Sequence, residues 1–543
     1  MYLLIKNAHI ATMDARNPFS QAAVINGEYF VFVGSNEDAV SFISRRTNQY
    51  DVIDMQGKLL IPGFNDSHLH YLHYVKNRYL SVDLSGSTSF ADMMSRMHSA
   101  YEVRNLKAGE WLICEGWNQD KFSDEKRFPT AADLDEISRD IPIIAMRVCF
   151  HVGVLNTKAM ELIGLDREKA AELGEYAGKF DDGSPNGILK EYIFDNIKQE
   201  LPAPDVDELV EMMIRGQNDL FALGITSIQS DDLKYVVGGH AYDLLEKLRA
   251  ASQSGRLKVR MSEQCLFDTP ESYSAFYDRG FDNSFGTKGF DISCIKLLQD
   301  GSLGARTALM SEPYADDPEN HGIAIHPQDE LNSMVAEAHK RNIAVAIHAI
   351  GDKAISMALS AIETAKVDMP YFNPHHGIVH CQITDRQLLE RFSKVGVAAL
   401  VQPVFIDYDM DICEARVGAA KAATSYAWRT LLSSGVITAF GTDCPVEPLD
   451  PMRGIWCAVT RRKLNGSATF NANEAISLSE ALYCYTAAGA AIQRKAHIKG
   501  QIRAGMLADF VVLDRNLFTL PYDEILNTRV LKTYIGGQAV YVA

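Results

Sequence analysis

Two histidines stand one residue apart in the stretch PGFNDSHLH, which runs from Pro62 to His70. Successive side chains of a β-strand alternate between its faces, so His68 and His70 would point the same way. Such a pair can offer two imidazole nitrogens to one metal ion, or it can be two hydrogen-bonded polar residues on an ordinary strand. The choice depends on whether later strands supply further ligands.

Three more side chains that can bind a metal end apolar, strand-like runs later in the chain. His348 ends IAVAI and His380 ends GIV. Asp443 ends ITAFGT, and Pro445 stops that strand just after it. Each side chain would lie at the carboxyl end of a separate strand, where one centre could collect them. Imidazole and carboxylate ligands suit zinc, and also iron or manganese, so the sequence predicts a metal site.

Lys296 follows DISCI in a segment that is too apolar to be solvated. A lysine in such a place is usually paired with an acid, and Asp300 is close by in the sequence. The other interpretation is that burial lowers its pKa, so that a neutral amine takes up carbon dioxide. The resulting carbamate would bridge two metals. The residues themselves leave both interpretations open.

These residues need a scaffold that gathers several strand ends. The middle of the chain alternates strand-like runs with helical patterns, which is typical of a parallel sheet. The predicted strands are LLIPGFNDSHLH at the front, GITSIQS (224–230), LKVRMSEQCLF (257–267), DISCIKLLQ (291–299), NIAVAIHAI (342–350), HHGIVHC (375–381), GVAALVQP (396–403) and GVITAFGTD (435–443). Eight strand-plus-helix units predict a (β/α)8 TIM barrel, a fold whose active sites gather at the carboxyl ends of the strands.

Both ends of the chain are rich in short strands and turn residues, as in YLLIKNAHI and RVLKTYIGGQAVYVA. We expect residues 1–60 and 490–543 to form a small β-sandwich domain beside a barrel of residues 61–489. The gap between the first two barrel strands is too long for one crossover helix. An inserted α+β subdomain over roughly 75–205 is the simplest account.

The 543-residue chain carries 53 basic and 70 acidic residues, a net charge of −17. Nucleic acids and anionic membranes require basic surface, so neither is an expected partner. Nine cysteines lack CxxC spacing, which favours buried thiols in a reducing compartment. We find no signal-peptide pattern and no apolar run long enough for a membrane span, and we expect a cytoplasmic protein. A homodimer is the default oligomer.

Taken together, the segments resemble the amidohydrolase superfamily, and most closely the branch that contains N-substituted formamide deformylase. The resemblance covers nearly the whole chain. It is carried by PGFNDSHLH, FHVGVLNTKAM, IKLLQDGSLGARTALM, AIHAIGDKAI, GIVHCQ, GTDCPVEPLDP, SLSEALYCYTAAGAA and GQIRAGMLADFVVLD. It implies a (β/α)8 barrel with a small β-sandwich built from both termini.

The resemblance also implies the roles of the candidate ligands. His68, His70 and Asp443 would hold a first divalent metal. His348 and His380 would hold a second, and carboxylated Lys296 would bridge the two. His375 and His376 precede His380, which we prefer because it falls at the strand end. Zinc is the expected metal, and two ions are favoured, although some branches of the superfamily use one.

The implied function is a metal-dependent hydrolase that cleaves a non-peptide C–N bond in a small amide or N-substituted formamide. Asp443 would accept a proton from the attacking water and hand it to the leaving nitrogen. A rival function is a mononuclear deaminase that attacks an amidine-like ring carbon, but such enzymes lack the bridging lysine. A non-catalytic sensor on the same fold is a third reading, which the intact ligand set disfavours.

Four other side chains are weaker candidates for substrate contacts, because packing or loop bracing explains each of them as well. They are Arg306 in DGSLGARTA, Glu115 and Trp117 in CEGWNQD, and His151.

Overall fold

The computed structural model describes residues 2–107, 109–148, 151–191, 193–194, 197, 201, 203–236, 239–282 and 284–543. The chain divides into two compact units. The first joins Met1–Tyr71 to Ile214–Ala543, and the second is Leu72–Met213.

The first unit contains the expected (β/α)8 barrel. Its eight strands pair in the order β21-β20-β19-β18-β17-β16-β15-β8, and all seven ladders are parallel. The strands are β8 (Phe64–Leu69), β15 (Ile225–Ser230), β16 (Arg260–Leu266), β17 (Phe290–Leu298), β18 (Ala344–Ala349), β19 (Gly377–His380), β20 (Ala398–Val401) and β21 (Thr438–Phe440). The parallel barrel confirms the fold predicted from the alternating sequence pattern.

Helices follow the strands in the order that a parallel barrel requires. They are α8 (Val206–Ala222), α9 (Ala241–Gln253), α10 (Pro270–Asp278), α11 (Gln328–His339), α12 (Asp352–Asp368), α13 (Arg386–Val395) and α16 (Trp428–Ser433), with α17 (Pro451–Thr460), α18 (Leu478–Cys484) and α19 (Ala487–Ile492) after the last strand. Helix α13 shows the usual device: the Asp385 side chain caps its first turn, and Gly396 ends it in the left-handed conformation.

The stretch LLIPGFNDSHLH is divided between two sheets rather than forming one barrel strand. Leu59–Pro62 (β7) pairs with strands of the terminal sheet, and the barrel strand β8 begins at Phe64. Gly63 separates them, and a Cβ atom there would lie 2.1 Å from Thr226 Oγ1. Only glycine therefore lets the chain cross so close to β15.

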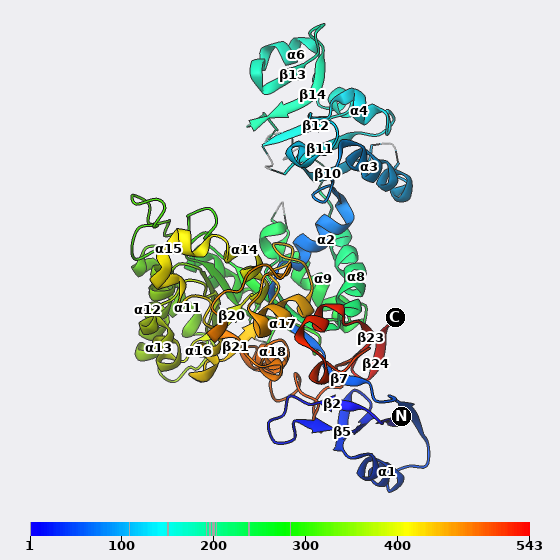
Figure 1. Ribbon diagram of the computed structural model, residues 1–543, viewed down its shortest axis with the longest axis vertical. Helices are drawn as coiled ribbons and strands as arrows, with labels where there is room; N and C mark the ends of the chain where they lie inside the picture. Colours follow the sequence, from blue (N-terminus) through cyan, green and yellow to red (C-terminus); the bar gives the residue numbers. More distant parts are fainter. Residues whose placement is uncertain are drawn as a thin grey trace. The chain divides into compact units, whose positions relative to one another are not determined.

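Strands from both chain ends form the small β-sandwich, shown in blue and red in Figure 1. One sheet has the order β5-β4-β1-β6, and the other has β24-β23-β22-β7-β2-β3. Their bounds are β1 (Tyr2–Lys6), β2 (His9–Ala11), β3 (Phe19–Ser20), β4 (Ala22–Asn26), β5 (Tyr29–Gly34), β6 (Tyr50–Asp54), β22 (Phe510–Leu513), β23 (Val530–Ile535) and β24 (Gln538–Val542). Buried Ile5, Ile25, Phe30 and Phe510 belong to one shared core, so the two termini stabilise each other.

The second unit is an α+β subdomain built on one six-stranded sheet. Its strand order is β13 (Ala177–Lys179), β14 (Pro185–Lys190), β12 (Val152–Leu155), β11 (Ile143–Arg147), β10 (Leu112–Trp117), β9 (Ser81–Asp83). Along β11, Ile143 and Ala145 face one core, while Ile144 and Met146 face another. This alternation covers the sheet on both faces, and α3 (Phe90–Arg104) supplies part of the first core.

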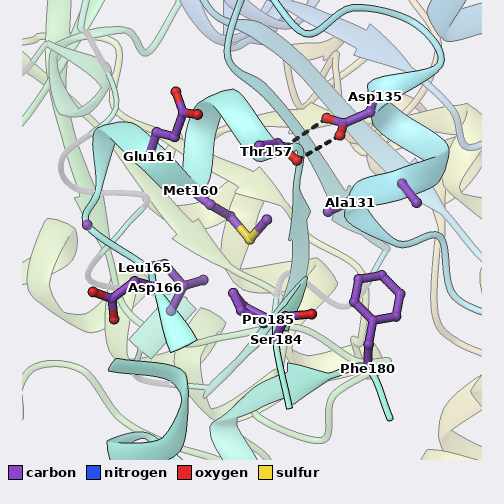
Figure 2. A pocket seen from close by; sticks show the side chains of 12 residues that line it. Ala131, Asp135, Thr157, Met160, Glu161, Leu165, Asp166, Phe180, Ser184 and Pro185 are labelled. Atoms are coloured by element: carbon purple, nitrogen blue, oxygen red, sulfur yellow. Dashed lines mark hydrogen bonds between the residues drawn. The ribbon is translucent and has the colours of Figure 1, made fainter. Parts of the chain in front are cut away.

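A cavity of about 670 Å³ opens in this second unit between α4 (Ala131–Asp135), α5 (Thr157–Leu162) and the turn before β14. Figure 2 shows Met160, Leu165 and Phe180 among the side chains that line it. The Asp135 carboxylate accepts hydrogen bonds from the Thr157 amide and hydroxyl at 2.9 and 2.7 Å. This acid therefore holds α4 and α5 together.

Eight cysteines of the described residues are buried and carry free thiols, and the ninth, Cys149, lies outside those residues. Within the described chain, every helix is either too short or too polar to cross a lipid bilayer.

A chain of buried hydrogen bonds precedes β19, the strand that ends in His380. The Val345 amide donates to His376 Nδ1 at 3.0 Å, so the protonated Nε2 of His376 faces His339 Nδ1 at 2.9 Å. His339 Nε2 then donates to the Met369 carbonyl at 3.0 Å. Each ring is satisfied only in its neutral form, and burial holds the pKa of His376 well below its usual range.

This arrangement predicts a pH-dependent contribution to stability. Below pH 6.5 the unfolded chain protonates His376 and the folded chain does not, so stability falls by up to about 1.4 kcal/mol per pH unit from this residue. His376→Met removes that dependence. Thermal unfolding of the metal-free proteins should show a difference in Tm that is largest at pH 8 and shrinks at pH 5. A difference that stays constant would contradict the neutral assignment.

Candidate metal centre

The candidate site lies at the seam between the first and last barrel strands. The Asp66 carboxylate accepts hydrogen bonds from the Thr442 hydroxyl at 2.6 Å and from its amide at 3.1 Å. The Asp443 amide donates to the His68 carbonyl at 2.9 Å, and the His70 amide donates to Cys444 at 2.8 Å. These bonds fasten the end of β21 to β8, and so they set two histidines opposite one aspartate.

The two halves of the seam approach each other very closely. A Cβ atom on Gly441 would lie 2.7 Å from the His68 amide nitrogen. Asp443 has a positive φ of 57°, which is uncommon for a residue with a side chain and recurs at functional sites. The glycine permits the contact, and Asp443 follows it two residues later in the chain.

His68, His70 and Asp443 form the one group of potential metal ligands found among the described residues, with the ligand atoms all within 4.8 Å of one another. Asp443 Oδ1 lies 3.2 Å from His70 Nε2 and 3.5 Å from His68 Nε2. All three residues are buried. His68 and His70 therefore point toward the same place, as the alternation of side chains along a strand predicts.

The hydrogen bonds of the two rings determine which nitrogens carry protons. His68 Nδ1 lies 2.6 Å from the Gln264 side-chain oxygen, and His70 Nδ1 lies 3.0 Å from the Asp231 carbonyl. Both oxygens can only accept, so both rings are protonated at Nδ1 and keep a lone pair at Nε2.

Three lone-pair atoms thus converge, since Asp443 Oδ1 is buried and receives no hydrogen bond from the described residues. Burying an acceptor such as Asp443 Oδ1 without a donor is costly. A divalent cation would satisfy all three atoms at once, and two imidazoles with one carboxylate are ligands that zinc accepts. The residues at the seam therefore fit a metal ion.

Lys296, on β17, lies beside this group with its side chain buried. Its Nζ is 3.0 Å from His68 Nε2. Burial lowers the pKa of Lys296, against the opposing influence of Asp231 and Asp443. Asp300, the sequence neighbour that could have neutralised it, instead accepts hydrogen bonds from the Leu309, Ile350 and Gly351 amides.

His348 and His380 stand together at the ends of β18 and β19. Their ring centroids are 4.4 Å apart, and those of His380 and His68 are 5.8 Å apart. Burial, with the positive charge of Lys296, lowers the pKa of His348 to about 3. Burial also holds the pKa values of His68 and His380 well below the usual range. These three rings are therefore neutral, as metal-ligating imidazoles must be.

The four weaker candidates have structural partners. Arg306 forms two hydrogen bonds with Asp316, at 3.1 and 2.9 Å. In the second unit, Trp117 is fully buried in a hydrophobic core, and burial raises the pKa of partly buried Glu115. His151 is exposed and lies 3.3 Å from the Glu191 carboxylate. We assign no substrate contact to these residues.

Sequence reasoning passed over Asp66, Gln264 and Asp231, which hold the candidate ligands in place. Asp66 carried a signal, because it lies inside PGFNDSHLH and shares its strand with His68. The other two carried none, since their roles depend on β15 lying beside β8, and β16 beside β15, in the barrel.

The barrel, its terminal sandwich and the candidate ligands at its strand ends point to one class of protein. The chain belongs to the amidohydrolase family, whose model matches residues 51–541. It is 31% identical to the YtcJ protein of Bacillus subtilis (strain 168) over 90% of each chain. It is 25% identical to N-substituted formamide deformylase of Arthrobacter pascens, over 99% of this chain and 98% of the other.

A solved structure supports the same grouping. The chain resembles an uncharacterized metal-dependent hydrolase from Pyrococcus furiosus with a TM-score of 0.75 and 29% identity. The match covers 95% of this chain and 99% of that one. The family and the fold are thereby established together.

The seam gives a testable prediction for Asp66. Asp66→Asn would place an amide NH2 against the Thr442 donors, and losing one buried hydrogen bond costs about 1–3 kcal/mol. We expect a lower Tm for the metal-free protein and weaker zinc binding. Asp385→Asn, which keeps a good helix cap, is the matched control. Unchanged zinc affinity in Asp66→Asn would mean that the seam does not position the ligands.

Proposed function

We propose that this protein is a metal-dependent hydrolase that cleaves a non-peptide C–N bond in a small amide or N-substituted formamide. The observation that carries the proposal is the convergence of two unprotonated imidazole nitrogens and one unpaired carboxylate oxygen, of His68, His70 and Asp443, at the mouth of a barrel. The formamide deformylase relative, similar over nearly its whole length, supports this substrate class.

His68, His70 and Asp443 would hold one divalent cation, with zinc the favoured ion. When bound, such a cation lowers the pKa of a coordinated water and polarises the substrate carbonyl. Asp443 would hold the cation through Oδ1, and its other carboxylate oxygen accepts the proton that water loses as the water oxygen adds to the carbonyl carbon. The same carboxyl then donates this proton to the nitrogen as the C–N bond breaks.

Lys296, His348 and His380 extend the proposal to a second ion. Burial lowers the pKa of Lys296 and so favours loss of its proton, and the neutral amine can react with carbon dioxide to give a carbamate and a released proton. That group would bridge two ions, and His348 and His380 would complete the second site. Their short ring separation and neutral state support this arrangement.

Two other functions remain as outcomes of experiment. A mononuclear deaminase would use the seam ligands without the lysine, and the position of Lys296 beside His68 argues against it. A ligand-binding sensor would not require a buried Asp443 oxygen, Oδ1, that accepts no hydrogen bond from the described residues. Metal-replete protein that hydrolyses no member of a broad amide, formamide and N-acyl panel would favour the sensor.

Replacement of Asp443 tests the proposed proton transfer. Asp443→Asn removes the acceptor while keeping the side-chain shape, so we expect kcat to fall at least about 100-fold, the lower end of general-base effects. Asp411→Asn, in an exposed ion pair with Lys463, is the control and should retain activity. Near-native turnover of folded Asp443→Asn on a formamide would overturn the assignment.

Metal analysis tests the number of ions. Elemental analysis of zinc-loaded protein should give two equivalents for the wild type and one for Lys296→Ala. Dialysis against a chelator should abolish hydrolysis, and added zinc should restore it. One equivalent in the wild type, together with an active Lys296→Ala variant, would favour the mononuclear deaminase.

A further inference from the structure

Two glutamines contact the candidate ligand histidines in the same way. The Gln264 side-chain oxygen lies 2.6 Å from His68 Nδ1, and the Gln402 oxygen lies 2.9 Å from His380 Nδ1. Both glutamines are buried, and they come from different strand regions, β16 and the end of β20. The repeated contact suggests a shared task.

Each amide is held in one orientation by a backbone carbonyl. Gln264 Nε2 donates to the Ser67 carbonyl at 3.0 Å, and Gln402 Nε2 donates to the Leu400 carbonyl at 3.3 Å. A carbonyl cannot donate, so each amide must turn its NH2 toward the backbone and its oxygen toward the imidazole. The histidine must then donate from Nδ1, which leaves its Nε2 lone pair free.

The other two candidate ligands are held by backbone carbonyls. His70 Nδ1 faces the Asp231 carbonyl at 3.0 Å, and His348 Nε2 faces the Gly301 carbonyl at 3.2 Å. A buried carboxylate stands near each of these rings: Asp231 Oδ2 lies 3.8 Å from His70, and Asp300 Oδ1 lies 3.4 Å from His348. Each half of the proposed centre therefore combines one glutamine-held ring with one carbonyl-held ring.

We infer that Gln264 and Gln402 are positioning residues that fix the Nδ1–H tautomer of His68 and His380, and thereby aim their Nε2 atoms at the metals of the proposed centre. The metal part of this inference rests on the proposed function, whereas the tautomers follow from hydrogen bonds present without metal. A neutral amide fixes the ring without adding negative charge. An imidazole that donates its Nδ1 proton to an amide gives a weaker Nε2 ligand for a metal than one that donates to a carboxylate.

The tautomers can be measured in the metal-free protein. We would label histidine side chains with ¹⁵N and record long-range ¹H–¹⁵N spectra of the wild type, Gln264→Met and Gln402→Met. The wild type should show Nδ1–H tautomers for His68 and His380, each assigned by its loss in a histidine variant. Each Gln→Met variant should lose one of these signatures. Nε2–H tautomers in the wild type, or signatures unchanged in both variants, would overturn the inference.

Metal affinity provides the second readout. Competition with a chromophoric zinc chelator should show 10–100-fold weaker zinc binding for Gln264→Met and Gln402→Met, the usual effect of losing such a partner. Gln264→Glu keeps an oxygen acceptor and should restore wild-type affinity or exceed it. Affinity equally weak in the Glu and Met variants would contradict a positioning role.

Gln217 supplies the matched control. It is also a buried glutamine, and its side chain joins the Arg256 carbonyl at 2.8 Å to the Lys258 amide at 2.8 Å, away from all candidate ligands. Gln217→Met should change neither tautomers nor zinc affinity. If tautomers are fixed but no substrate is hydrolysed, the proposed function fails while the inference about the tautomers stands.

Discussion

The site depends on how the barrel closes between its first and last strands. β8 and β21 stand at opposite ends of the strand order, and the Asp66 carboxylate joins them through the Thr442 amide and hydroxyl. These hydrogen bonds are buried, so if they were lost no water molecule could donate to the Asp66 carboxylate in their place. Because the seam closes there, side chains that lie almost 380 positions apart in the sequence come close enough together to bind one metal ion.

Burial sets the chemistry of the residues that meet at this seam. It depresses the pKa values of His68, His348 and His380, so that the rings are neutral nitrogen donors at physiological pH. It raises the pKa values of Asp66 and Asp300 to about 7, although both accept backbone hydrogen bonds. The centre therefore gathers electron-pair donors in a place where water cannot satisfy them, and this favours a cation.

Much of this arrangement could be predicted from the sequence, because strand ends in a parallel barrel converge by geometry alone. His348, His380 and Asp443 each end a buried apolar run, and this pattern is readable without a structure. The division of LLIPGFNDSHLH into two strands was not foreseen, although the Pro62-Gly63 pair marks a break in the run. The close approach of Gly63 to Thr226 shows why a glycine stands at that break.

The residues that support the candidate ligands were harder to predict, for a physical reason. Gln264, Gln402 and the Asp231 carbonyl act through partners that lie 22 to 196 positions away in sequence. Glutamine carries no charge and has no spacing rule, so its function appears only when the neighbouring strand is in place. The positive φ of His380 and Asp443 is likewise imposed by the fold and is not a local preference of these residues.

The most direct test of the account is anomalous diffraction from zinc-loaded crystals, collected on both sides of the zinc absorption edge. We predict one peak bounded by His68 Nε2, His70 Nε2 and Asp443 Oδ1. A second peak should lie between His348 Nδ1 and His380 Nε2, with density for a carbamate on Lys296 Nζ between the two. Zinc bound elsewhere, with no anomalous peak at the seam, would contradict the central claim.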